Sequence, residues 1–158
     1  MPIGLDHTIL EVHDLAESLS FYRDVVGLEH KGKDGPFEGM LITPDLALEL
    51  YDEWPVGGPR HLAFAMDRAT FEATFERVRN AGIAYGDGPS QTDNMKGPAP
   101  SSGVHGSTDS VYFKDPNGHI LEILTYDLAP STQGASQSKL EHRTDVPITS
   151  GVGRPRTP

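Results

Sequence analysis

The chain has 158 residues, a length typical of one compact domain whose core needs neither a disulfide nor a structural metal. It contains no cysteine, which excludes thiolate metal ligands, a cysteine nucleophile and a disulfide framework. The formal net charge of −10 argues against nucleic acid as a partner, and no apolar run is long enough to span a membrane, so the sequence predicts a cytoplasmic protein.

The first half of the sequence predicts one strand, one helix and a group of short strands. Residues 5–12 alternate between two faces, as a half-buried strand does. Asp14 is a plausible helix N-cap, apolar residues then recur at helical spacing, and Gly27 is a natural helix end. Glycine-rich residues 28–43 fit short strands and turns, and 46–51 form an apolar strand.

The second half repeats this order. Its segments are a strand at 61–66, a helix between Asp67 and Gly82, a Gly/Pro/Ser-rich stretch at 86–106, a strand at 111–113, a hairpin turn at 115–118 and a strand at 120–124. The repetition predicts two βαβββ modules, 1–55 and 58–127, within one α+β domain of residues 1–128. Residues 129–158 are rich in Ser, Thr, Pro and Gly and show no period, so we expect a disordered tail or an arm bound to a partner subunit.

Two histidines and two glutamates occupy matching places in the two halves. His7 and His61 lie in the opening strands, and Glu49 and Glu122 interrupt otherwise apolar strands. A charged glutamate in such a strand is costly unless it is paired or bound to a cation. Strand alternation places all four on the faces opposite the predicted helix-packing faces, so two cupped sheets would bring them into one cavity. The pattern predicts a metal site, and the alternative is a set of hydrogen-bonded polar residues in a binding cleft.

Four segments carry a resemblance to a known family. They are LDHT at 5–8, SFYRDVVGL at 20–28, RHLAF at 60–64 and VYFKDPNGHILE at 111–122. With them, residues 3–127 resemble the vicinal oxygen chelate superfamily of glyoxalases, bleomycin resistance proteins, fosfomycin-resistance enzymes and extradiol dioxygenases. The resemblance implies a cupped, partly open mixed β-barrel. It also implies metal ligation by His7, His61 and Glu122, with Glu49 matching the fourth ligand of the glyoxalase branch.

The resemblance implies four candidate functions. The spacing from His105 through Tyr112 to Glu122 resembles the extradiol dioxygenase signature, which implies an Fe(II) or Mn(II) dioxygenase whose His105 and Tyr112 act on the substrate. Glu49 favours the alternative of a glyoxalase-type lyase or isomerase with Ni(II), Co(II) or Zn(II), in which Glu49 is a fourth ligand or a base. The second alternative is a small-molecule binding protein without turnover. Epoxide opening, as in fosfomycin resistance, ranks below the dioxygenase and the glyoxalase because basic residues for a phosphonate are not evident.

The resemblance also implies a homodimer that binds a small-molecule substrate. Short two-module chains in this superfamily often exchange modules and build their sites at the interface. In that arrangement His7 and Glu49 of one chain would face His61 and Glu122 of the other. His119, in the predicted turn before the last strand, is expected to be structural.

Overall fold

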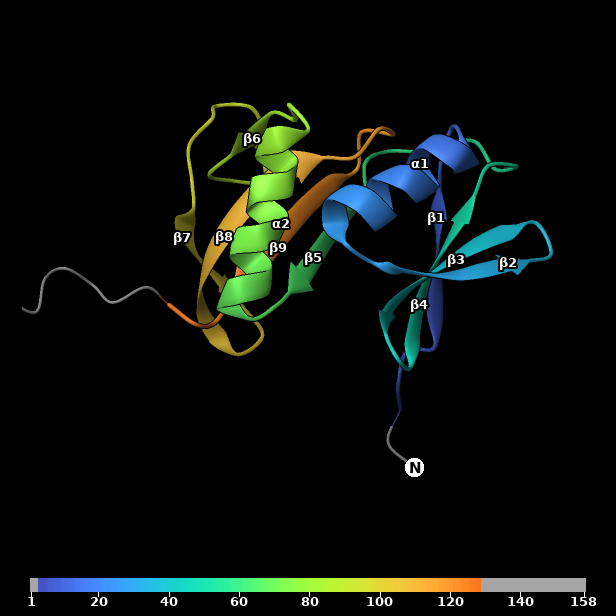
Figure 1. The fold of residues 1–158 in the computed structure, drawn as a ribbon, viewed down its shortest axis with the longest axis horizontal. Coiled ribbons are helices and arrows are strands. Elements are labelled where there is room, and N and C mark those ends of the chain that lie inside the picture. The colour runs from blue at the N-terminus through green and yellow to red at the C-terminus, as the bar shows by residue number, and fades with distance from the viewer. Residues whose placement is uncertain (1–2, 129–158) are drawn as a thin grey trace, which may run out of the picture.

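The computed structural model describes residues 3–128, which form two β-sheets with two α-helices and one π-helical turn (Figure 1). The predicted tail, 129–158, lies outside the described residues. The elements of the first half are β1 (His7–Glu11), α1 (Leu15–Phe21), the π-helical turn (Tyr22–Val26), β2 (Glu29–Asp34), β3 (Phe37–Thr43) and β4 (Leu46–Tyr51). Those of the second half are β5 (His61–Ala65), α2 (Arg68–Asn80), β6 (Tyr85–Gly86), β7 (Ala99–Gly103), β8 (Gly106–Lys114) and β9 (Ile120–Thr125).

Each half contributes one sheet with the same mixed strand order. The first sheet runs β1-β4-β3-β2 and the second runs β5-β9-β8-β6, with β7 also paired to β8. The opening strand of each half lies parallel to its last strand, β1 beside β4 and β5 beside β9, and the other pairs are antiparallel. This repetition confirms the predicted α+β fold of paired modules. Within residues 3–128 the two sheets stay separate and do not close into a barrel.

Strand β7 differs from the sequence prediction. No strand is predicted within the Gly/Pro/Ser-rich stretch, and in the structure Ala99 to Gly103 pairs with β8 from Ala99↔Ser110 to Gly103↔Gly106. Its sequence, Ala-Pro-Ser-Ser-Gly, has neither apolar alternation nor β-branched residues, so no pattern marks it as a strand. The backbone ladder with β8 determines its conformation instead.

Local capping explains where the helices begin and end. The side chain of Asp14 accepts a hydrogen bond from the backbone N–H of Glu17, and Asp67 caps α2 through Thr70 in the same way. The helical segment of the first half ends at Gly27, whose φ of 92° lies in the left-handed region. A Cβ atom at Gly27 would lie 2.7 Å from Nη2 of Arg77 on α2, so glycine also permits close packing there. None of the helices in residues 3–128 is long and apolar enough to cross a membrane.

The helix-facing sides of both sheets share one hydrophobic core. Leu48 and Leu50 of β4 are fully buried, as are Leu121 and Ile123 of β9. Helix α1 packs on β3 and β4, and α2 packs on β9 and on the π-helical turn, so the helices lie where the two halves meet (Figure 1). The opposite faces of the sheets are left outside this core, and they carry the candidate ligands.

The hairpin turn before β9 joins the second half to the first. Asp115 accepts a hydrogen bond from the hydroxyl of the buried Tyr22 at 2.9 Å. Asn117 donates to the hydroxyl oxygen of Ser18 at 3.1 Å and accepts from the backbone N–H of His13 at 2.7 Å. The turn therefore joins the start of β9 to α1 and to the residues on either side of that helix.

His119 completes this connection between the halves. Its Nδ1 accepts from the backbone N–H of Arg60 at 3.1 Å, and its Nε2 donates to the carbonyl oxygen of Glu11 at 2.8 Å. Because Nδ1 is an acceptor, the ring is neutral with its proton on Nε2. Arg60 also donates to the carboxylate of Glu11 at 3.0 Å. The residue before His61 is thereby fixed against the last residue of β1.

Candidate metal centre

His61 and Glu122 lie side by side on the face of the second sheet that is opposite the helices. His61 opens β5, and Glu122 lies on the parallel strand β9 opposite Ala63. Nε2 of His61 is 3.3 Å from Oε2 of Glu122. The glutamate side chain is 7% exposed and the histidine side chain 45% exposed, so the carboxylate is buried beneath an accessible imidazole.

His7 and Glu49 repeat this arrangement in the first sheet. His7 opens β1, and Glu49 lies on the parallel strand β4 opposite Ile9. Nδ1 of His7 is 2.8 Å from a carboxylate oxygen of Asp6, and this hydrogen bond, with a further contribution from the charge of Glu49, raises the pKa of His7. A carboxylate on one ring nitrogen leaves the other nitrogen available as a metal ligand.

The two pairs do not meet within one chain. No three His, Asp or Glu side chains of residues 3–128 are placed so that they could share a metal ion. Each pair is nevertheless suitable as half of a site, because imidazole and carboxylate are common ligands of divalent metals. Two ligand atoms that each lie about 2.0–2.2 Å from one metal are roughly 3 Å apart, close to the separation of His61 and Glu122. The donor set therefore fits a metal that needs further ligands from elsewhere.

Tyr112 contacts the metal-ligand candidate Glu122 directly. Its hydroxyl donates to Oε1 of Glu122 at 2.9 Å and lies 2.9 Å from the hydroxyl of Ser101 on β7. The ring is 4% exposed and stacks against the imidazole of His61, with centroids 6.3 Å apart. Burial, with a further contribution from Glu122, raises the pKa of Tyr112. The predicted contact of Tyr112 with a substrate stays a prediction.

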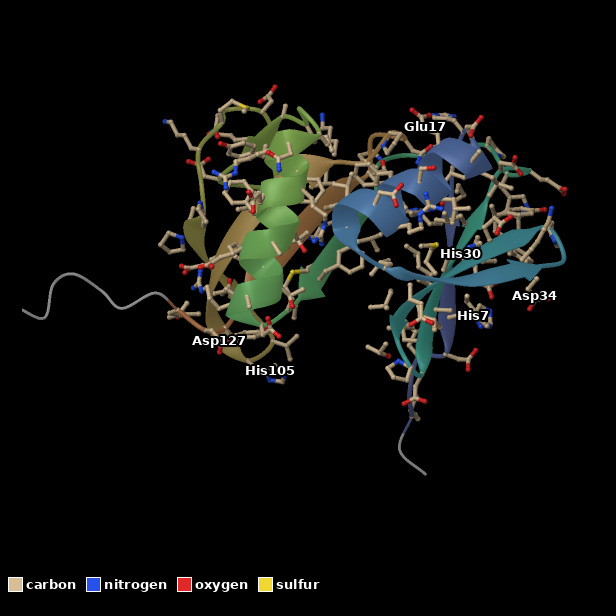
Figure 2. The ribbon with its side chains drawn as sticks, in the orientation of Figure 1. His7, Glu17, His30, Asp34, His105 and Asp127 are labelled. Carbon is tan, nitrogen blue, oxygen red and sulfur yellow. The ribbon has the colours of Figure 1, made fainter. Side chains whose placement is uncertain are left out.

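His105 lies at the tip of the β7–β8 hairpin. Its ring contacts the edge of Tyr126, and its backbone N–H donates to the Tyr126 hydroxyl at 3.3 Å. It is seven residues along the strand from Tyr112, which corresponds to about 20 Å of extended chain. Figure 2 shows His105 at the end of the second sheet, far from His7 on the first. Within one chain, His105 is therefore remote from both pairs, and its predicted role stays a prediction.

Sequence reasoning missed two neighbours of these pairs. Asp6 precedes His7 directly, and a carboxylate beside a ligand histidine is a recurring arrangement that could have indicated it. Ser101 lies in the Gly/Pro/Ser-rich stretch, eleven residues before Tyr112, and no local pattern identifies it.

A family model described as the Glyoxalase/Bleomycin resistance protein/Dioxygenase superfamily matches residues 4–123. The chain belongs to this superfamily. The sequence resemblance is thereby confirmed, and the matched region contains all four candidate ligands.

Relatives within the superfamily differ in their chemistry. The solved structure named Oxidase ChaP-H2 is 35% identical, with a TM-score of 0.67, and the match covers 79% of this chain and 94% of that one. A lactoylglutathione lyase of Neisseria meningitidis serogroup A is 31% identical over 75% of this chain and 87% of its own length. The metallothiol transferase FosB of Shouchella clausii is 24% identical over 80% of this chain and 82% of its own length. The prediction of an enzyme is confirmed, and these names leave its reaction class open.

Proposed function

We propose that the chain is a metal-dependent oxidoreductase that acts on a small molecule with two adjacent oxygen atoms, such as a catechol. The observation that carries the proposal is the repeated pair of His and Glu, His7 with Glu49 and His61 with Glu122, in one register on two separate sheets. The 35% identity to an oxidase over most of both chains favours oxidation over the other reactions of the superfamily.

The metal site is proposed to form between two copies of the chain. Each pair lies on a sheet face outside the core, and one chain does not bring the pairs together. A second copy would supply the missing pair, so that His7 and Glu49 of one chain join His61 and Glu122 of the other. The exposed large side chains of Leu5 and Trp54 flank β1 and β4, and a partner covering this sheet would remove them from water.

The residues of the site would divide the chemistry as follows. His7, His61 and Glu122 would hold a divalent metal, with Glu49 as a fourth ligand or a free carboxylate beside it. A bound metal would polarise the substrate oxygens as a Lewis acid, and iron or manganese would add redox chemistry. An unbound Glu49 would accept a proton from a substrate hydroxyl, because the structure gives its carboxylate no hydrogen-bond donor within residues 3–128.

A glyoxalase-type lyase is the second candidate. Glu49 favours it, because two histidines and two glutamates suit nickel, cobalt or zinc acting as a Lewis acid without redox chemistry. The 31% identity to a lactoylglutathione lyase supports it independently. In this candidate Glu49 would move a proton between adjacent carbon atoms of the substrate.

Metal loading distinguishes the two candidates. Metal per chain is measured after loading with Fe(II), Ni(II) or Zn(II), and oxygen uptake is measured with catechol, for wild type, Glu49→Gln and the control Glu76→Gln on the exposed side of α2. Iron retained in Glu49→Gln, together with oxygen uptake by the wild type, supports the oxidoreductase. Metal affinity that collapses in Glu49→Gln alone, without oxygen uptake by the wild type, favours the lyase. Wild-type protein that takes up no metal contradicts both.

A further inference from the structure

The hydroxyl groups of Ser101 and Tyr112 form a directed chain of hydrogen bonds that ends on Glu122. A phenol has one proton, and Tyr112 gives it to Oε1 of Glu122, which as a carboxylate can only accept. The contact between Ser101 and Tyr112, at 2.9 Å, must then run from the serine proton to the tyrosine oxygen. The direction is therefore Ser101 to Tyr112 to Glu122.

This chain leaves the two oxygens of Glu122 in different surroundings. Oε1 is engaged by Tyr112, and Oε2 faces Nε2 of His61 at 3.3 Å. The carboxylate is almost fully buried, so rotating it away from Tyr112 would leave a buried polar group without its partner. Tyr112 therefore holds Oε1 in place, and Oε2 is directed at His61.

Glu49 lacks an equivalent restraint. Its position matches that of Glu122 in register, yet within the described part of the chain its carboxylate makes no hydrogen bond. The difference comes from the neighbouring strand, because Glu122 pairs with Tyr112 on β8 whereas Glu49 pairs with Gly39 on β3, which has no side chain to donate. The two glutamates therefore have similar sequence surroundings, but a hydrogen bond restrains the carboxylate of Glu122 and none within residues 3–128 restrains that of Glu49.

We infer that Ser101 and Tyr112 are positioning residues that make Glu122 a fixed metal ligand through Oε2 alone, while Glu49 is the mobile carboxylate of the site. This inference rests on the proposed function, because it requires a metal beside His61. Because Glu122 is already held in place, less conformational entropy is lost when it binds the metal. Glu49 is unrestrained, so it can leave the metal or accept a proton during turnover. Tyr112, supported by Ser101, thus gives the repeated fold an asymmetric site, since the first sheet has a glycine at the matching position.

Cobalt(II) tests this inference because its binding and its visible absorption both report ligation. Tyr112→Phe should weaken cobalt binding by about 10- to 100-fold, the range typical of lost hydrogen bonds to metal ligands. It should also change the visible spectrum, because Glu122 is then free to offer both oxygens. Ser101→Ala should weaken binding less. Ser101→Thr, which keeps a hydroxyl, and Ser102→Ala, which alters an exposed neighbour on β7, should behave as wild type.

The outcomes separate this inference from the proposed function. Thermal melting of the metal-free variants reports whether they fold. If Tyr112→Phe does not fold, the inference is tested by comparing Ser101→Ala with Ser101→Thr, which keeps the hydroxyl group. Wild-type affinity and spectrum in both Tyr112→Phe and Ser101→Ala would overturn the inference and leave the metal site standing. Equal weakening by Ser102→Ala would also overturn it, because the effect would then be a general one of β7. Failure of the wild type itself to bind cobalt would overturn the proposed function and this inference together.

Discussion

Nε2 of His61 lies 3.3 Å from Oε2 of Glu122, across two parallel strands that come from opposite ends of the second half of the chain. The same register places His7 and Glu49 together in the first half. Two such pairs on separate sheets are the product of a repeated module, and neither pair alone is a complete metal site. The proposed chemistry therefore depends on how the pairs are combined.

Removing one ligand of a pair should affect metal binding more than folding. His61→Ala takes away an accessible imidazole, and Glu122→Gln takes away the charge of a buried carboxylate while keeping its shape. Each should weaken cobalt(II) binding by more than about 100-fold, beyond the usual effect of residues that only support a ligand. Equilibrium cobalt titration checks this, with Glu76→Gln as the control. Metal retained at wild-type affinity by a folded His61→Ala protein would exclude His61 as a ligand.

The pairs were predictable from the sequence because they follow strand periodicity. Glu49 and Glu122 interrupt apolar strands, and alternation alone places them on the face opposite the buried aliphatic residues on either side. The structure confirms this placement: Leu48 and Leu50 are buried in the core, and Glu49 lies on the other face. The face on which each glutamate lies can be predicted because the two-residue period of a strand is a local feature of the sequence.

The supporting contacts were not predictable because they join residues far apart in the chain. Ser101 lies in a segment without apolar alternation, and its partner Tyr112 is reached only through the β7–β8 hairpin. His119 contacts Glu11 across 108 positions of sequence. The separation of His105 from both pairs likewise depends on how far the hairpin extends, which spacing in a motif does not specify.

Breaking the ion pair between the halves should have a pH-dependent effect on stability. The hydrogen bond from Arg60 lowers the pKa of Glu11 from its ordinary value of 4.5. The pair therefore stabilises the folded state above the pKa of the unfolded chain, and this contribution disappears as the pH falls through the folded pKa. Because Arg60 is largely exposed, Glu11→Gln should lower the free energy of unfolding at pH 7 by less than about 1 kcal/mol. Chemical denaturation from pH 7 down to below pH 4 should show wild type and variant converging, and a constant difference would contradict this account.

Loss of the buried His119 ring should have a larger effect. The side chain is 0% exposed and links the backbone of Arg60 to that of Glu11. His119→Ala removes both hydrogen bonds and leaves a cavity, so the free energy of unfolding should fall by about 2–4 kcal/mol. Denaturant titration measures the change, and His13→Ala, which alters an exposed histidine, is the matched control. A change for His119→Ala no larger than that for His13→Ala would show that the link does not hold the halves together.

Metal recovery in mixed dimers tests most directly whether the site is shared between two chains. His7→Ala and His61→Ala proteins are unfolded together, refolded as a mixture and loaded with cobalt(II). A shared site predicts recovery to about a quarter of the wild-type metal content, because about half of the dimers are mixed and each mixed dimer has one intact site of two. Mixing His61→Ala with Glu122→Gln, which damage the same pair, should recover none. If His7→Ala with His61→Ala also recovers none, although mixed dimers form, the site does not combine residues of two chains.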